Sequence, residues 1–220
     1  MSAHTLAAVS GSHSVPHDGL VDLPSDAPAA FREAVRSLRR ASPRREVVLK
    51  EIPPPQRLAP WSFVFTAEVP LPASEEFATG RLVLLYDPEG QEAWDGTFRI
   101  VTYVTSEVDA EMANDPLFGQ VSWGWLVESL ERAGAGYVAA GGTVTRTVST
   151  RFGDLAGDGA GSDASEDICD VEIRASWTPG GADLSAHVRA WCEFLCTTAG
   201  LPPPGVTALH PSGRPPIGAA

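Results

Sequence analysis

The side chains best suited to chemistry lie near the C-terminal end of this sequence. Cys192 and Cys196 are four residues apart, so on a helix they share one face, and His187 precedes them by about a turn and a half. A tetrahedral zinc site needs its ligands to converge on one point, but this spacing turns His187 away from Cys192. We interpret the cysteines as small apolar core residues and His187 as a partly exposed histidine. We predict neither a metal site nor a catalytic thiol here.

A second group of ligand-forming side chains is acidic. It precedes a predicted helix and comprises Glu107, Asp109, Glu111 and Asp115. The central glycine of a calcium loop is missing, and acids before a helix stabilise its N-terminal dipole without an ion. The glycine clusters at 134–136 and 141–142 follow a helix and precede a strand, the reverse of a phosphate-binding loop. We therefore predict no catalytic residue, no cofactor and no metal.

The element around which these groups are arranged is a predicted central helix at 115–136. Asn114 or Asp115 suits its N-cap, and Pro116 suits its first position because the missing N–H has no helical partner there. Glycines at its end favour a left-handed stop. About five helical turns fit between these signals.

The predicted central helix is apolar on two sides. One face carries Leu117, Phe118, Val121 and Trp125, and the other carries Trp123, Leu126, Val127 and Leu130. A surface helix usually has a single apolar stripe. Either this helix lies between a sheet and another helix of its own chain, or one face packs on a second copy. The second alternative predicts a twofold homodimer with an interface drawn from Leu117, Val121, Trp123 and Trp125.

Apolar patterning predicts six strands around this helix. They span residues 46–52, 61–69, 81–86, 97–105, 143–152 and 169–177, with a turn at 87–90. A first helix begins near Ser25 or Asp26. A last helix after Asp183 has one narrow stripe of Leu184, Val188, Trp191 and Leu195. Short connections between strands favour antiparallel pairing.

This order predicts one α+β domain, in which helices cover one face of an antiparallel sheet in the order α-β-β-β-α-β-β-α. We place the domain at 25–200, with a mobile acidic loop at 153–167. Residues 1–24 and the Pro- and Gly-rich residues 201–220 are predicted to be disordered tails.

The charge of the chain limits its partners. A formal net charge of −12 argues against nucleic acid or an anionic membrane as an obligatory partner. The first helix ends in a basic cluster, which either complements the helix dipole or binds an acidic partner: Arg36, Arg39, Arg40, Arg44 and Arg45. Three cysteines suggest reduced thiols. With no leader and no apolar run long enough to span a bilayer, the sequence predicts a cytoplasmic protein without a membrane segment.

Several motifs recur in order in a known family. They are PSDAPAAFREAVRSLRRA, WSFVFTAEV, ATGRLVLLYDP and SWGWLVESLERAGA. Over residues 26–200 the chain resembles an uncharacterised actinobacterial family classed as a domain of unknown function, a resemblance that implies no activity, cofactor or catalytic residue. The element order is also similar to that of type III secretion chaperones, which dimerise partly through the middle helix and bind other proteins.

We therefore expect a non-enzymatic, dimeric module that binds another protein, either chaperone-like or an adaptor. The alternative is an enzyme or small-ligand binder with a pocket between sheet and helices. A pocket lined by polar groups with perturbed pKa values would favour the alternative, whereas a flat apolar patch around Trp123 or Trp125 would favour the first.

Overall fold

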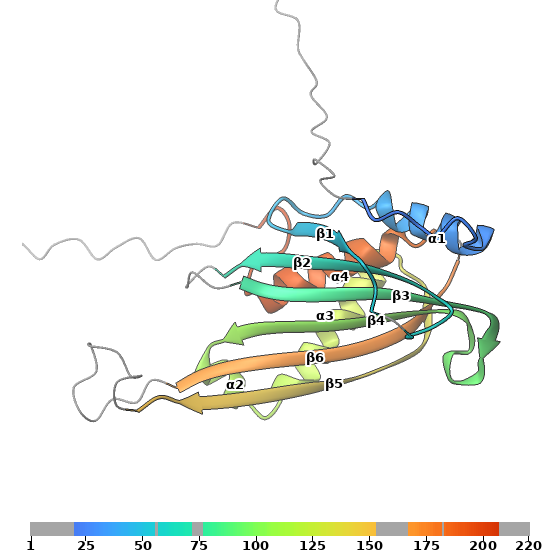
Figure 1. Cartoon of the computed structure of the whole chain (residues 1–220). Coiled ribbons are helices and arrows are strands. Elements are labelled where there is room, and N and C mark those ends of the chain that lie inside the picture. The colour runs from blue at the N-terminus through green and yellow to red at the C-terminus, as the bar shows by residue number, and fades with distance from the viewer. Residues whose placement is uncertain (1–19, 56, 72–76, 153–166, 182, 207–220) are drawn as a thin grey trace, which may run out of the picture.

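The fold is a six-stranded antiparallel sheet with helices on one face (Figure 1). The computed structural model describes residues 20–55, 57–71, 77–152, 167–181 and 183–206. Most of the two expected tails and of the expected acidic loop lies outside these described residues. The α+β class and the antiparallel sheet are as predicted.

The strands pair in the order β1-β2-β3-β4-β6-β5. Their bounds are β1 Val48–Ile52, β2 Trp61–Pro70, β3 Phe77–Gln91, β4 Gly96–Val108, β5 Tyr137–Thr150 and β6 Asp167–Pro179. Four strands precede the middle helices, one more than the order stated above. The first four form a meander, whereas β6 pairs with β4 and leaves β5 at the edge.

The prediction of a turn at 87–90 is wrong. These residues lie within β3, where the register shifts between Tyr86 and Gln91 and Gly90 has a φ of 74°. The chain reverses instead at a short 3-10 helix, η1 Glu92–Trp94, which ends at Asp95 in the left-handed region. A turn-forming sequence can also form a β-bulge when both flanking strands continue, and the sequence pattern did not distinguish the two.

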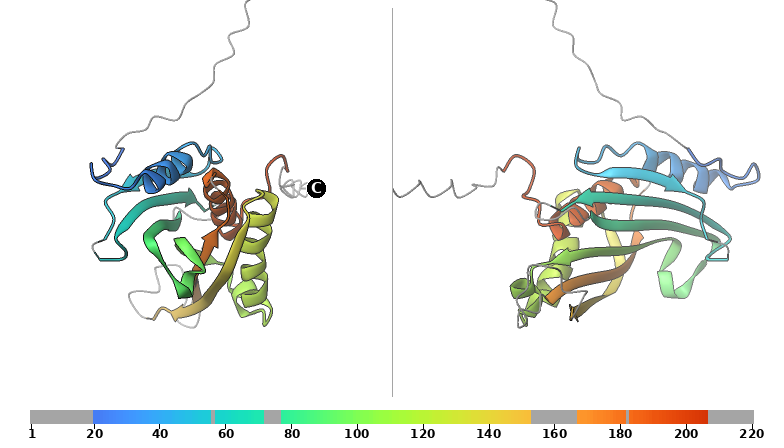
Figure 2. Two further views of the ribbon diagram at one scale, coloured as in Figure 1. Left: turned by 90° about the vertical axis from the view of Figure 1, so that its right-hand side faces the viewer. Right: turned by 60° about the vertical axis from the view of Figure 1, so that its left-hand side comes forward.

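The helices are α1 Ala29–Arg39, α2 Ala110–Asn114, α3 Phe118–Arg132 and α4 Ser185–Thr198. α4 lies between α1 and α3 on the same side of the sheet and contacts both (Figure 2). On the opposite face, a small cluster of Val64, Val83 and Leu85 is covered by Ala59 and Trp94, among others.

The expectation of one narrow stripe on the last helix is wrong, because α4 is buried on nearly every side. Besides the four predicted residues, it buries Ser185, His187, Ala190, Cys192, Phe194, Cys196 and Thr198. Alanine and cysteine are small, so they let helices and sheet approach α4 closely. Gly80 of β3 has the same role, since a Cβ there would lie 2.8 Å from the Trp191 ring. The core is therefore organised around α4 rather than α3.

Candidate functional site

The helix predicted at 115–136 corresponds to α3, and a separate short helix, α2, lies just before it and ends at Asn114. Asp109 caps α2, its Oδ1 accepting from the backbone N–H of Glu111 at 2.7 Å. Asp115 makes the hydrogen bond expected of an N-cap, although regular α3 begins only at Phe118. Its Oδ1 accepts from the N–H of Leu117 at 2.7 Å in the turn before α3. These two acids therefore satisfy backbone donors at the helix starts.

The buried face of α3 includes two serines, Ser122 and Ser129. Ser122 donates to Phe118 O at 2.8 Å and Ser129 donates to Trp125 O at 2.7 Å, and both are buried. A hydroxyl bonded to the carbonyl four residues earlier is satisfied within its own helix. Each serine thus serves as a small core residue.

The four expected interface residues do not share one environment. Trp123 is half-buried and lies over Gly142 of β5, where a Cβ would be 2.8 Å from its ring. Trp125 is also half-buried and meets Phe118 edge to face, with ring centroids 6.1 Å apart. Leu117 and Val121 are 58% and 46% exposed. Their own chain therefore covers much of the tryptophans and little of Leu117 and Val121.

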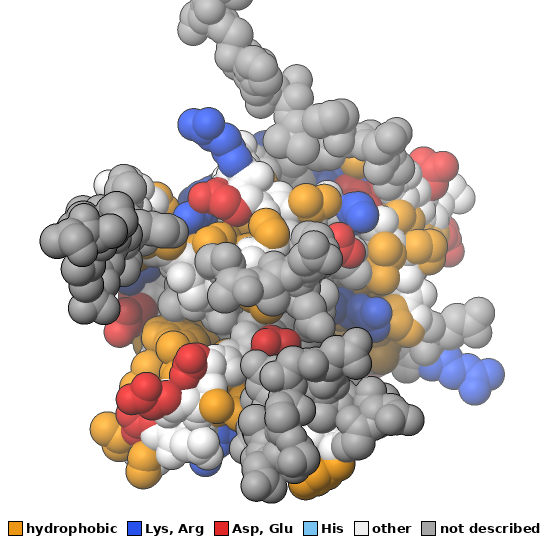
Figure 3. All heavy atoms as spheres, turned by 90° about the vertical axis from the view of Figure 1, so that its left-hand side faces the viewer, with side chains coloured by type: hydrophobic (Ala, Val, Ile, Leu, Met, Phe, Trp, Pro, Cys, Tyr) orange, Lys and Arg blue, Asp and Glu red, His pale blue; other side chains and the backbone are white. Residues whose placement is uncertain are grey.

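The exposed apolar residues of α2 and α3 form one candidate surface. We call Met112, Leu117 and Val121 the α2–α3 apolar surface; Met112 is 45% exposed. Figure 3 looks onto this end of the molecule, where hydrophobic and acidic side chains gather side by side. The acids Asp109, Glu111 and Asp115, all exposed, flank this surface in the sequence. An apolar centre with a charged rim is typical of protein-binding surfaces.

The strand β5 is the second candidate surface. It has fourteen residues, and all but Tyr137 and Val144 are exposed. It pairs with β6 on one side, and no strand pairs with its other side in the described part of the chain. The charge on this strand is Arg146, whose guanidinium donates to Ala113 O at 2.7 Å and Asp115 O at 3.1 Å. Arg146 therefore holds α2 and the following turn instead of shielding the edge.

A pocket of about 340 Å³ lies between α3, α4 and the segment after α1. Its lining is Ser42, Pro43, Arg44, Ser129, Arg132, Ala133, Arg189, Glu193 and Pro204. Arg44 is bound by the carboxylates of Glu46 at 2.9 Å and Glu193 at 3.5 Å, and its hydrogen bond to Glu46 raises the pKa of Arg44. This pocket lies between helices, not between sheet and helices as the alternative prediction supposed.

Sequence reasoning missed this arginine pocket because its cations come from three distant segments. Arg132 and Arg189 lie on the solvent sides of two helices, where arginine is ordinary. Each of the two helices carries a single arginine, and these cannot be matched with Arg44 before the helix packing is known.

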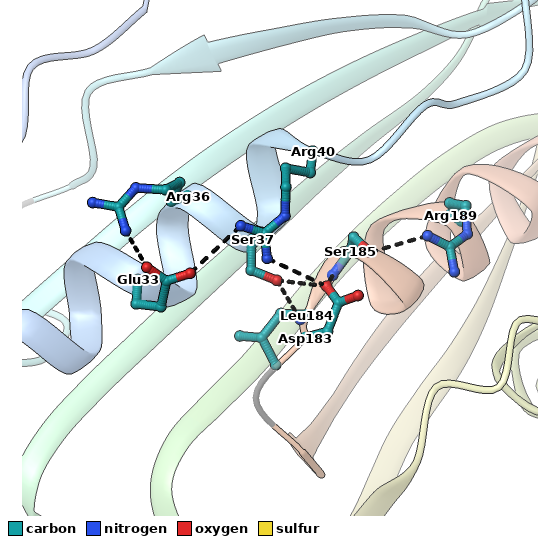
Figure 4. Close-up of polar contacts among 8 residues, drawn as sticks. All are labelled: Glu33, Arg36, Ser37, Arg40, Asp183, Leu184, Ser185 and Arg189. Carbon is teal, nitrogen blue, oxygen red and sulfur yellow. Dashed lines mark hydrogen bonds and ion pairs between the residues drawn. The ribbon is translucent and has the colours of Figure 1, made fainter.

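The predicted acidic-partner patch is largely paired within the chain. Arg39 forms two bonds to Glu51, at 2.8 and 2.7 Å, and a third to Val21 O. Arg36 pairs with Glu33, and Arg40 lies 3.4 Å from Glu33 and 3.9 Å from Asp183 (Figure 4). Arg44 belongs to the pocket above, and Arg45 is exposed beside Glu46, whose pKa it helps to lower.

A polar junction joins α1 to the start of α4 (Figure 4). Ser37 donates to Asp183 Oδ1 at 2.7 Å and accepts from the N–H of Leu184 at 2.6 Å. The hydrogen bond from Ser37 is the main cause that lowers the pKa of Asp183 to about 2. This arrangement fixes the start of α4, so it is structural.

The candidate zinc and thiol residues are buried in the core. His187 was expected to be partly exposed, and this is wrong: it is fully buried, and its Nδ1 accepts from Trp177 Nε1 at 3.2 Å. Burial lowers the pKa of His187 to about 4, and burial raises the pKa of Cys196 to about 12. Burial also raises the pKa of Cys192. A neutral buried imidazole and protonated thiols cannot meet a substrate from solvent.

Among the described residues, no three His, Cys, Asp or Glu side chains are grouped as metal ligands would be. In the same residues, no helix is long and apolar enough to cross a bilayer.

The fold and these surfaces define an α+β protein with a long open sheet edge. The chain belongs to a family described as protein of unknown function (DUF3000), whose model matches residues 27–207. The predicted membership in an uncharacterised family is thereby confirmed. No curated protein and no solved structure matches the chain.

Proposed function

We propose that this protein is a non-enzymatic, homodimeric module that binds another protein, as an adaptor or chaperone-like subunit would. The observation that carries the proposal is the α2–α3 apolar surface, with three large apolar side chains each close to half exposed or more. Contiguous apolar groups of this kind on a soluble protein mark binding surfaces. The open edge of β5 supports association with a second copy.

The chemistry of the core supports a non-enzymatic role. The described groups most suited to acid–base or nucleophilic work, His187, Cys192 and Cys196, are buried away from solvent, and burial keeps both thiols protonated. Catalytic groups need access to a substrate as well as a suitable pKa.

Partner binding is tested by site-specific photo-crosslinking in the native cytosol. A photoreactive residue at Val121 should link the chain to one partner, and a residue at Gln120, its exposed polar neighbour, serves as the matched control. Purified partner should bind the Val121→Glu variant at least about tenfold more weakly, because a charge would be placed in an apolar contact. Equal crosslinking from both positions would contradict a specific surface at Val121.

Homodimerisation is tested separately, by sedimentation velocity of the full chain. The wild type should sediment as a dimer at tens of micromolar. Val121→Glu should leave this dimer intact if the α2–α3 apolar surface serves the other partner.

A second function, binding of a small organic anion, is favoured by the arginine pocket. Glu46 and Glu193 offset the charge of Arg44. Arg189, and Arg132 whose ion pair with Glu128 is exposed, are then the cations able to hold a carboxylate or phosphate. Citrate and phosphate should then raise the melting temperature of the wild type, and not that of Arg132→Gln/Arg189→Gln. A rise of equal size in both proteins would indicate a general salt effect.

A further inference from the structure

We infer that β5 pairs antiparallel with β5 of a second copy about a twofold axis, joining the two six-stranded sheets into one of twelve strands. This inference rests on the proposed homodimer and specifies how it forms. It concerns a surface distinct from the α2–α3 apolar surface, which remains open for another protein.

The first step is that β5, from Gly141 onward, is a sheet edge without the usual protection. At about 3.3 Å per residue its fourteen residues extend for about 46 Å. Natural edges are shortened or carry proline, lysine or inward charges that prevent pairing. β5 contains neither proline nor lysine nor any acid, and Arg146 is occupied by the carbonyls of Ala113 and Asp115. Among the described residues, no other strand pairs with the outer side of β5 from Gly141 to Ser149, so this backbone is available to another strand.

The second step is that the side chains of β5 suit a second copy. A twofold axis perpendicular to the sheet keeps each residue on its own face, so outer-face residues meet outer-face residues. The outer face of β5 carries Thr143, Thr145 and Thr147, which are uncharged and β-branched, as strand neighbours often are. Although the whole chain has a net charge of −12, this edge can meet its copy without bringing acids together.

The third step fixes the register. A bulge between Val138 and Gly141 limits regular pairing to the residues from Gly141 onward. An axis at Arg146 would place the two Arg146 side chains opposite each other. An axis at Thr145 keeps nearly the whole regular segment paired and sets Arg146 opposite Val144 instead. We therefore place the axis at Thr145, with Thr143 opposite Thr147 of the second copy.

The helix above β5 is compatible with this arrangement. Trp123 lies over Gly142, so α3 stands above the edge strand with its half-buried Trp123 on that side. Val127 follows one turn later on the same side of α3 and is also half-buried. Pairing of the two sheets brings the two α3 helices toward each other and covers the remaining exposed parts of these side chains. Of the four interface residues expected from the sequence, Trp123 thus belongs to the dimer.

The direct test is a disulfide at the axis. In the full chain, Thr145→Cys faces its own copy at a Cα separation of about 4.5–5.5 Å, which suits a disulfide. Mild oxidation should give a covalent dimer in high yield. Thr79→Cys, exposed on the outer face of β3, is the matched control, and the native cysteines are buried. Equal crosslinking of both variants would overturn the pairing at Thr145.

A second test weakens the dimer without disturbing the monomer. Thr143→Lys/Thr145→Lys/Thr147→Lys places lysines beside Arg174, Glu172 and Asp170 of β6 and makes three like-charge pairs across the axis. Its dissociation constant should rise at least about tenfold. The control Thr79→Lys/Gln91→Lys adds lysines away from the edge, opposite Glu68 and near Asp87, and should dimerise like the wild type.

The outcomes separate the two proposals. A monomeric wild type at tens of micromolar would remove both the homodimer and the strand pairing. A dimeric wild type in which the edge lysines have no effect and Thr145→Cys forms no disulfide would overturn the strand pairing alone. A dimer that crosslinks at Thr145 and dissociates with the edge lysines supports both.

Discussion

The two edges of the sheet differ in how they are protected. β1 has five residues, is followed by Pro53–Pro55, and carries Lys50. Its Glu51 is bound by Arg39 and by the N–H of Val21, which brings the chain before α1 against this edge. β5 is nearly three times as long and has none of these features. One sheet thus shows that an edge can be closed within the chain or left for association.

The largest expected effect on stability comes from removing the Arg39–Glu51 ion pair at the β1 edge. Arg39→Ala would leave the Glu51 side chain, 4% exposed, without its cation. Because an unpaired buried carboxylate is costly, we expect a loss of about 3 kcal/mol in the free energy of unfolding, measured with urea.

Arg36→Ala is the control for this loss. The Arg36–Glu33 pair is exposed on both sides, so its removal should change stability by less than about 0.5 kcal/mol. Similar losses in the two variants would mean that Arg39 does not close the β1 edge.

The second effect is the pH dependence of stability that the buried His187 causes in the core between the two edges. The neutral His187 holds the Nε1–H of Trp177 on β6, and its pKa is lowered from 6.5 to about 4. The contribution of the neutral His187 to the free energy of unfolding is fully present above pH 6.5 and is lost as the pH falls toward 4. By pH 5 the loss is about 2 kcal/mol. Urea unfolding of the wild type and His187→Gln from pH 7 to 4.5 measures it. The variant, without a titrating group, should lose less stability, and parallel curves would contradict this assignment.

The third effect concerns two adjacent glycines of β5. A Cβ at Gly142 would lie 2.4 Å from Arg174 O and 2.8 Å from the Trp123 ring, whereas a Cβ at Gly141 meets nothing within 4 Å. Gly142→Ala should therefore cost about 2 kcal/mol, through displacement of β5 from β6 or of Trp123. Gly141→Ala should be nearly neutral. Equal losses would mean that β5 is loosely held, unlike β1.

Gly142 also shows why the sequence predicted some elements and not others. The strict alternation at 61–69 identified β2, because each inward residue there is large and apolar. The start of β5 at Tyr137 was missed, because Ala139 to Gly142 are small and break the strand pattern. Their smallness is explained only by Trp123 and by the backbone of β6, which come from elsewhere in the chain.

The candidate surfaces were likewise predictable only where they depend on the local sequence. Leu117 and Val121 were named from the helical pattern alone, and they are exposed. The pattern could not show that Trp123 and Trp125 are half-covered by their own chain, since that depends on β5 and on Phe118. The open edge was beyond prediction for a further reason. It depends on β6 pairing between β4 and β5, a choice that strand sequences alone did not determine.

The smallest expected effect compares the cations of the two edges. Lys50 on β1 lies 3.8 Å from Glu68 with both side chains exposed, so Lys50→Gln should change stability by less than about 0.5 kcal/mol. Arg146 on β5 binds two carbonyls, so Arg146→Gln should cost about 1 kcal/mol. Sedimentation should show the Arg146→Gln dimer to be no tighter than the wild type, because the guanidinium faces α2 and does not repel a second strand. A dimer strengthened several-fold by Arg146→Gln would show instead that Arg146 protects this edge, and the contrast between β1 and β5 would then be one of degree.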